Sequence, residues 1–120
     1  MNITATEQHL SKFLSSELGL QSDNALFRGR LPLQKINALA VAVDDVECSG
    51  CAETVNFNIS LFGRYRSRDD ALNIATKLVK LLPVYRSDFS LLPASPMQFE
   101  ESSFDGQDAT ILKLSVNAKL

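Results

Sequence analysis

The clearest hydrophobic pattern covers residues 55–83, where a strand-like segment passes directly into a helix-like one. In VNFNISL, four apolar residues alternate with Asn and Ser, which is the period of a strand with one buried face. From Ala71 to Leu82 the apolar residues instead recur every three or four positions, as on one face of a helix. Ser67 and Asp70 fit an N-terminal capping box, and the proline after Leu82 cannot continue the helix. We therefore predict a central strand followed by a helix that covers one face of the sheet.

A second amphipathic pattern lies near the N-terminus. Residues Thr4 to Glu7 fit another capping box, apolar residues follow at helical spacing, and Gly19 stands where a left-handed C-terminal cap is expected. We predict a helix from Thr6 to Leu18. His9, the single histidine, has no other metal-type ligand beside it in sequence, so we interpret it as a packing or solvent-facing residue.

The region between the two amphipathic patterns contains one predicted loop and one predicted strand. Gln21 to Lys35 has no sustained period and includes Gly and Pro, so it is predicted to be a loop that crosses toward the sheet. Four apolar residues are expected to anchor it: Leu26, Phe27, Leu31 and Leu33. Residues 36–43 (INALAVAV) predict a strand with larger side chains on one face and only alanines on the other. The small side chains indicate close approach of a helix or of another subunit.

Two hairpins are predicted from turn signals. Acidic residues and Ser49-Gly50 separate two apolar runs, so the strands on either side should pair antiparallel. Asp105-Gly106 is a strong hairpin signal, and an alternating segment from Thr110 to Ala118 follows it. Pro93 and Pro96 limit the segment before this last hairpin to an edge or irregular strand.

These elements predict the α+β class. We expect an antiparallel sheet of four to five strands with two helices packed on one face, in the order helix, hairpin, helix, hairpin. The 120 residues correspond to a single domain, residues 1–120, and 45% hydrophobic with 22% charged residues is ordinary for a globular protein.

Overall charge excludes some partners. The formal net charge of -2 gives no field that attracts nucleic acid, and no apolar run is long enough to span a bilayer. The N-terminus lacks the basic and apolar regions of a secretory signal. We expect a protein that is made in a cytoplasm and has no membrane partner.

Charged residues are nevertheless segregated along the chain. One acidic stretch holds Asp44, Asp45, Glu47 and Glu53, and a second holds Glu100, Glu101, Asp105 and Asp108. The arginines gather elsewhere, at Arg28 and Arg30 and at Arg64, Arg66 and Arg68. In extended chain the last three project to one side, and guanidinium groups pair bidentately with carboxylates and phosphates. The basic patch is therefore either a solvated strand end or an interface, and segregation of this kind suits a head-to-tail self-interface.

Catalytic chemistry is not indicated. Cys48 and Cys51 form a C-x-x-C, but a redox site needs the motif to open a helix, and zinc needs four ligands. Reduced or incidental cysteines, a local disulfide or shared metal, and a redox site remain the alternatives, in that order. The sequence contains no phosphate loop, hydrolase motif or zinc-protease motif. We therefore predict no catalytic residue, cofactor or metal site, and a protein that is not an enzyme.

Four segments together resemble the tail-terminator (tail-completion) and minor capsid proteins of long-tailed bacteriophages. They are the N-terminal amphipathic helix; Leu26-Phe27-Arg28-Gly29-Arg30-Leu31-Pro32 before the alanine-rich strand; the strand from Val55 to Phe62 leading into Arg64-Tyr65-Arg66-Ser67-Arg68-Asp69-Asp70-Ala71; and the Asp105-Gly106 hairpin. The resemblance spans nearly the whole chain. Cys48 and Cys51 are not part of it.

The resemblance implies a structural virion protein at the tail–neck junction. Its subunits would form a ring, usually of six, that docks on the tail tube, ends tube polymerisation and presents a surface to the head. The implied partners are further copies of the chain, the tail tube protein and the head–tail connector or neck proteins. Genome DNA would pass through the lumen without sequence-specific binding, in keeping with a pI near 5.3.

The resemblance leads to two interface hypotheses, and two alternative functions remain open. Arg64, Arg66 and Arg68 are expected to meet Asp44, Asp45 and Glu47 of a neighbouring subunit or the tail tube, with Arg28 and Arg30 as further basic interface candidates. The hairpin tip around Gly50 is a second candidate partner surface. The alternatives are a head-side neck or connector protein, and a small host α+β ligand-binding or regulatory domain.

Overall fold

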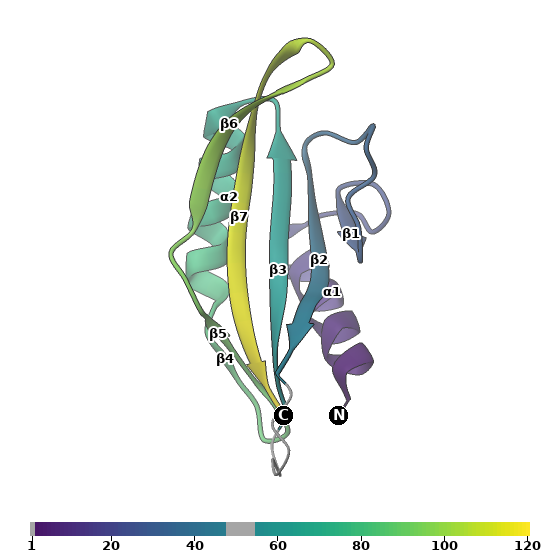
Figure 1. The fold of residues 1–120 in the computed structure, drawn as a ribbon, viewed down its shortest axis with the longest axis vertical. Helices are drawn as coiled ribbons and strands as arrows, with labels where there is room; N and C mark the ends of the chain where they lie inside the picture. The colour runs from purple at the N-terminus through teal and green to yellow at the C-terminus, as the bar shows by residue number, and fades with distance from the viewer. Residues whose placement is uncertain (1, 48–54) are drawn as a thin grey trace.

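The computed structural model describes residues 2–47 and 55–120, which form two helices and seven strands (Figure 1). The helices are α1 (Ile3–Leu18) and α2 (Arg68–Leu81). The strands are β1 (Leu26–Arg28), β2 (Ala38–Val46), β3 (Asn56–Tyr65), β4 (Val84–Tyr85), β5 (Ser90–Pro93), β6 (Gln98–Phe104) and β7 (Gln107–Lys119).

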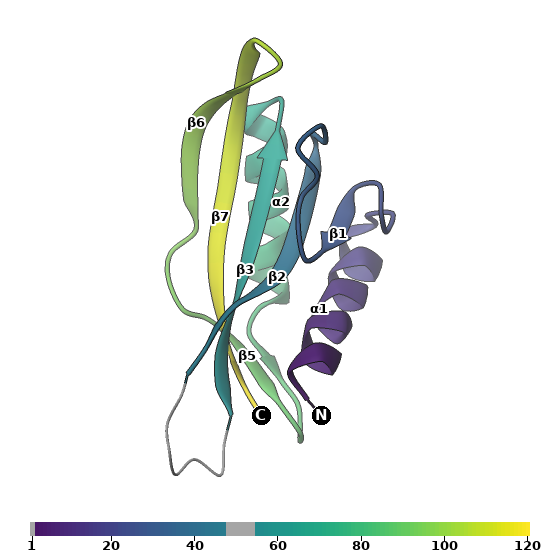
Figure 2. The same cartoon turned by 45° about the vertical axis from the view of Figure 1, so that its right-hand side comes forward.

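All seven strands belong to one curled sheet. Six of them follow the order β1-β2-β3-β7-β5-β4, and β6 pairs with β7 outside this order. β7 pairs with β3 along one edge, while β6 and then β5 share its other edge (Figure 2). β1 runs parallel to β2, whereas the remaining neighbours are antiparallel. The sheet is therefore mixed, and strands account for more of the chain than helices do.

The predicted sheet of four to five antiparallel strands, with its helix–hairpin order, is wrong. β1 falls inside the segment predicted to be a loop, and it exists because Leu26, Phe27 and Arg28 pair in register with Leu39, Ala40 and Val41. β4 and β5 are only two and four residues long, too short for an alternating pattern to be recognised. β6 is an edge strand whose residues are exposed except for the half-buried Phe99 and Phe104, so it shows no alternating apolar pattern.

Local signals indicated β2, β3 and α2. β3 is central, β2 pairs antiparallel with it, and Ser67 Oγ accepts a hydrogen bond from Asp69 N at 3.2 Å as the N-cap of α2. The hairpin between β6 and β7 turns at Asp105 and Gly106, whose φ angles of 54° and 75° are the positive values that a two-residue type I′ turn requires.

The first helix begins earlier than predicted. Its N-cap is Asn2, whose Oδ1 accepts a hydrogen bond from Ala5 N at 2.7 Å, so α1 starts three residues before Thr6. Gly19 ends the helix in the left-handed conformation, with φ of 67°, as the sequence indicated. Glu7 is not a capping residue, because its carboxylate contacts β1 and β2 instead.

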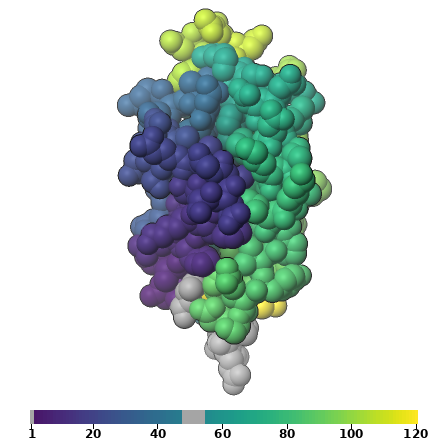
Figure 3. All heavy atoms as spheres, turned by 180° about the vertical axis from the view of Figure 1, so that it is seen from behind, coloured from purple at the N-terminus to yellow at the C-terminus, as the bar shows by residue number. Residues whose placement is uncertain are grey.

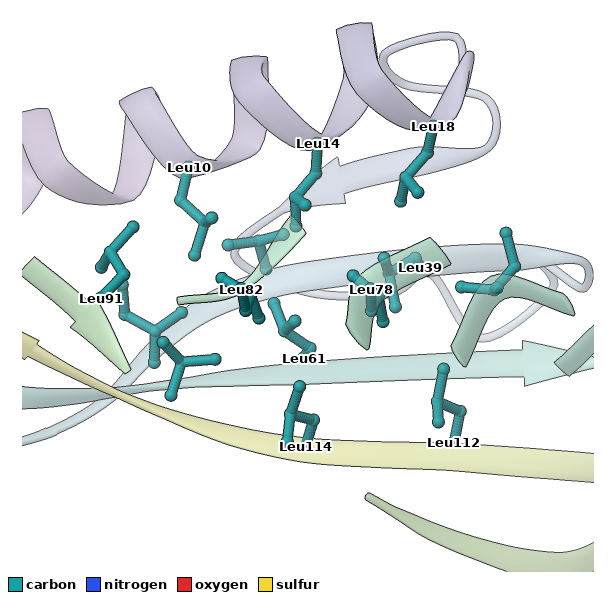
Figure 4. Packing of buried hydrophobic residues seen from close by; sticks show 14 of the residues in the cluster. Leu10, Leu14, Leu18, Leu39, Leu61, Leu78, Leu82, Leu91, Leu112 and Leu114 are labelled. Carbon is teal, nitrogen blue, oxygen red and sulfur yellow. The ribbon is translucent and has the colours of Figure 1, made fainter. Parts of the chain in front are cut away.

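Both helices lie on one face of the sheet, behind it in Figure 1, and Figure 3 shows them next to each other on that face. The leucines of α1 point at the sheet and meet those of α2, β2, β3 and β7 (Figure 4). This cluster is the main core, and its largest fully buried side chains include Phe57, Leu10, Leu14, Leu39, Ile59, Leu61 and Leu112. Neither α1 nor α2 covers the opposite face, which we call the open face.

The molecule is elongated, with principal extents of 49 × 26 × 24 Å. The β6–β7 turn and the start of α2 lie at the upper end in Figure 1, and both termini lie at the lower end. Among the residues that the structure describes, no helix is long and apolar enough to cross a membrane. The C-x-x-C pair and the tip around Gly50 fall outside the described residues.

Candidate functional site

Two of the three clustered arginines are used inside the subunit. Arg64 lies on the open face at the end of β3, and its Nη1 donates hydrogen bonds to Leu33 O at 3.3 Å and Lys35 O at 2.9 Å. Arg66 Nη1 donates to Phe104 O and Asp108 O, each at 3.0 Å. Arg64 thus links the β1–β2 connection to the end of β3. Arg66 links the β6–β7 hairpin to the segment that follows β3.

The Phe104 ring joins the two guanidinium groups. Its centre lies 5.2 Å from Arg64 Cζ and 5.5 Å from Arg66 Cζ, distances at which a cation is attracted to the ring face. The sequence did not indicate this contact, because Phe104 is about forty positions away along the chain. The arginine cluster therefore stabilises contacts between segments of its own subunit, and it is also a charged surface.

Arg68 remains available to a partner. It is exposed at the start of α2, and within residues 2–47 and 55–120 its side chain makes no hydrogen bond or ion pair. Arg30 is also exposed without such a contact, on the β1–β2 connection. Arg28 differs, because its Nε pairs with Glu7 Oε1 at 3.0 Å.

The predicted acidic residues lie at the far end of β2. Asp44, Asp45 and Glu47 are exposed, and the β2–β3 register shifts between Val43 and Asp45. Asp45 Oδ1 accepts a hydrogen bond from Asn58 Nδ2 at 2.7 Å. The carboxylates of Asp44 and Glu47 have no hydrogen-bond or ion-pair partner in the described part of the chain.

The basic and acidic groups are held apart by the length of the β2–β3 ladder. Arg64 is paired with Ala38 at one end, and Asp45 is paired with Asn58 near the other. At about 3.3 Å per residue, β2 separates these two positions by roughly 20 Å along the long axis. Subunits that stand side by side in the same orientation would keep them apart. A contact between the two groups therefore requires copies that are displaced along this axis, antiparallel, or stacked end to end.

The open face carries a shallow groove with both polar and apolar residues in its lining. One hollow of ≈ 420 Å³ runs over β3 and β7 between Asp44 and the β5–β6 connection, and its floor includes Ser60, Lys113 and Ser115. A neighbouring hollow of ≈ 310 Å³ extends over Ala40 and Ala42. The alanine-rich face of β2 is thus covered in part by a loop, since Leu31 packs on Ala38 and Ala40.

In the described ranges, no three His, Cys, Asp or Glu side chains gather closely enough to hold a metal ion. His9 is a packing residue, as interpreted from the sequence, with its ring stacked on Phe13 and edge-on to Phe89 at centroid distances of 6.4 and 5.0 Å. Burial, and to a smaller extent the Asp70 carboxylate, raise the pKa of the Tyr65 hydroxyl above its ordinary value.

Two surface features were missed by sequence reasoning. Leu33, which we expected to anchor a loop, is 83% exposed, and Val79 on α2 is 63% exposed. Val79 borders an apolar pocket of ≈ 220 Å³ between the end of α2 and the β5–β6 connection. Helical spacing had placed Val79 on the buried face of α2, and only the position of the sheet shows that it lies outside the core.

In comparisons with known proteins, no family model and no curated protein matches this chain.

Proposed function

We propose that this protein is a structural component of a bacteriophage tail. Copies of the chain would form a ring, most simply of six, at the head-proximal end of the tail tube. The ring would end tube polymerisation and provide the surface to which the head joins. The proposal draws on the resemblance carried by the arginine-rich strand end, the alanine-rich strand and the final hairpin.

The observation that carries the proposal is the charge difference between the two ends of one elongated subunit. Arg68 is exposed at one end, while Asp44 and Glu47 are exposed at the other, and β2 and β3 hold these ends apart. In a ring of subunits with a common orientation, one rim would carry Asp44 and Glu47, and the other would combine Arg68 with the exposed carboxylates at the start of α2 and in the β6–β7 hairpin. Two unlike rims suit a junction, because each can bind a different partner.

Unlike rims also suggest how a tube would stop growing. If one rim binds the tail tube protein, the rim left exposed differs from the end of the tube in charge and shape. A further tube subunit then lacks its complementary surface, whereas a head–tail connector or neck protein can supply one. No chemical step is required for this role.

Genome DNA would pass through the lumen of such a ring during ejection. Non-specific DNA binding requires Lys and Arg that can neutralise phosphates. Here Arg64 and Arg66 donate to backbone carbonyls, Arg28 pairs with Glu7, and Lys113 Nζ pairs with Glu100 Oε1 at 3.0 Å. A subunit with a formal net charge of -2 and these internal pairings suits a channel to which DNA does not adhere.

Tail length in phage lysates tests the proposal. Lysates that lack this protein should contain abnormally long, headless tails by negative-stain electron microscopy, and restoring the protein should return tails to normal length. Tails of normal length that fail to join heads would assign the protein to the head-side neck. Virions unaffected by its loss would contradict both roles and favour a small ligand-binding or regulatory domain.

A further inference from the structure

Strand β6 is an edge of the sheet with free backbone groups. It pairs only with β7 and lies at the margin of the molecule in Figure 2. Phe104 and Gln107 flank the two-residue turn of this hairpin, so they form a hydrogen-bonded pair, and bonded and non-bonded pairs alternate from there. The N–H and C=O groups of Phe99, Glu101 and Ser103 therefore point away from β7. Within the described residues, no hydrogen bond reaches them.

The same alternation holds along β7. Its Ser115 O, on the side that faces β5 and β6, accepts a hydrogen bond from Ala94 N at 2.8 Å. Its Asp108 O, on the side that faces β3, accepts one from Arg66 Nη1 at 3.0 Å. Odd-numbered residues of β7 thus bond toward β6, and even-numbered residues bond toward β3. The β6 residues opposite the even-numbered ones consequently keep their backbone groups on the free edge.

The two ends of the strand order offer less free edge among the described strands. β1 has three residues, and Leu26 at its start is already bonded to the preceding turn. Its N–H donates to Gln21 O at 3.2 Å, and its carbonyl accepts from Asp23 N at 2.8 Å. β4 has only two residues. A second copy that extends the sheet at β6 would therefore present its own β6.

A hollow that is lined by both signs of charge lies beside this edge. Its volume is ≈ 250 Å³, and Arg68 and Glu101 line it together with Arg66, Ser102 and Asp108. Arg68 and Glu101 make no ion pair within the described ranges. A surface that holds a base and an acid close together can bind a second copy of itself, because a two-fold axis brings the base of each copy to the acid of the other.

We propose that two copies of this chain associate by antiparallel pairing of their β6 strands about a two-fold axis. The free groups of Glu101 in one copy would bond to those of Ser103 in the other, and Ser102 would lie opposite Ser102. The axis of such a pair is perpendicular to the sheet, so the helices of both copies lie on the same side. Glu101 of the second copy would then lie on the same face as Arg68, level with the hollow.

Charge selects this register. Only residues whose backbone groups point outward can exchange hydrogen bonds, so the axis must place one residue of β6 opposite itself. An axis at Glu100 or Glu101 would set like carboxylates directly opposite each other, which destabilises a strand pair. An axis at Ser102 avoids this contact, and residues 100–104 of the two strands still overlap.

The contact would occupy the α2 end of the subunit, where the β6–β7 turn and the start of α2 lie together (Figure 1). Arg68 would face the second copy in place of a tail or neck protein, so self-association and docking would exclude each other. The inference goes beyond the proposed function, since a two-fold contact differs from the heterologous contact that closes a ring.

Cysteine cross-linking tests the position of the axis. In a chain whose two native cysteines are replaced with Ser, Ser102→Cys should form a disulfide-linked dimer, because opposed residues of a non-hydrogen-bonded pair have Cα atoms about 4.5 Å apart. Glu100→Cys, on the same face of β6, is the control. In this register the two copies of residue 100 lie about 13 Å apart along the strands. Equal cross-linking of the two variants, or none at position 102, would overturn the proposed pairing.

Ser103→Pro tests the backbone hydrogen bonds. It removes an N–H that points to the free edge, where proline is tolerated, and leaves the bonds to β7 in place. Dimerisation measured by sedimentation velocity should weaken by about tenfold or more. Ser103→Ala keeps the N–H and should dimerise like the wild type. Circular dichroism establishes that both variants are folded, and equal dimerisation of the folded variants would contradict the pairing.

Tail length in phage lysates separates this inference from the proposed function. If the protein restores normal tails but position 102 does not cross-link, the two-fold contact is refuted and the terminator role stands. If position 102 cross-links and Ser103→Pro weakens dimerisation, while virions are unaffected by loss of the protein, the contact stands and the tail role fails.

Discussion

The guanidinium group of Arg66 lies 5.5 Å from the centre of the Phe104 ring, and its Nη1 donates a 3.0 Å hydrogen bond to the Phe104 carbonyl oxygen. A second bond from the same atom reaches Asp108 O on the other strand of the hairpin. Arg66 therefore holds both strands of the β6–β7 hairpin near its turn. The residue that the sequence suggested as an interface charge has a structural role within its own subunit.

Arg66→Ala should loosen this hairpin. We expect faster amide hydrogen exchange over residues 102–109 and a loss of about 1–2 kcal/mol in the free energy of unfolding, because charge-assisted hydrogen bonds are removed at a partly exposed site. Arg68→Ala is the matched control, since its side chain makes no such contact within the described residues. Unchanged amide hydrogen exchange in the Arg66 variant would contradict this stabilising role of Arg66.

Arg68→Glu tests the charge that is left unpaired at the α2 end of the subunit. Reversing this exposed charge should reduce joining of the ring to its partner, with a larger effect at low than at physiological ionic strength, while the fold is unaffected. Lys77→Glu reverses an exposed charge further along α2 and serves as the control. Counting joined and unjoined tails by electron microscopy measures the effect, and equal counts for both variants would remove Arg68 from the interface.

Glu7 connects α1 to two strands of the sheet. Its Oε1 pairs with Arg28 and its Oε2 accepts a 2.7 Å hydrogen bond from Val43 N, with 15% of the side chain exposed. Glu7→Ala should lower the free energy of unfolding by about 1–3 kcal/mol, since a backbone donor loses its partner. Glu7→Gln keeps an acceptor and should cost less. Urea denaturation distinguishes the two, and equal losses would show that only the charge matters.

Gly63 lies under the Tyr65 ring. A Cβ at position 63 would be 2.5 Å from Tyr65 Cε2, so either the ring or the backbone of β3 would have to move. Gly63→Ala should therefore destabilise the fold by about 1–3 kcal/mol, as overpacking does in other cores. In the Tyr65→Leu background the same substitution should cost less, and thermal unfolding of the four chains measures this coupling.

The Tyr65 hydroxyl should make stability fall at alkaline pH. It is buried without a hydrogen-bond partner in the described residues, and its pKa is raised above the ordinary value near 10. Above that pH the unfolded chain releases the proton while the folded chain retains it, so the free energy of unfolding decreases as pH rises. Tyr65→Phe should reduce this decrease in unfolding experiments between pH 9 and 11. Tyr85→Phe, at an exposed ring, is the control, and equal behaviour of the two variants would contradict the prediction.

The sequence by itself determined the elements whose signals are local. β3 follows from strict alternation of buried and polar residues, α2 from a cap and a helical apolar face, and the last hairpin from Asp105-Gly106. Each signal depends on backbone preference or on one buried face within a few residues. Nothing distant in the chain is needed to specify it.

The tertiary structure alone decided the sheet's extent and the use of its charged residues. β1, β4 and β5 are too short for a local pattern to identify, and they exist through the pairing of β1 with β2, of β4 with β5 and of β5 with β7. The same holds for Arg66 and Glu7, whose partners are 38 and 36 positions away, and for the open face, which no local pattern identifies. The positions of charged residues in the sequence predicted where charge is concentrated. The tertiary structure decided which of those charged side chains remain available to a partner.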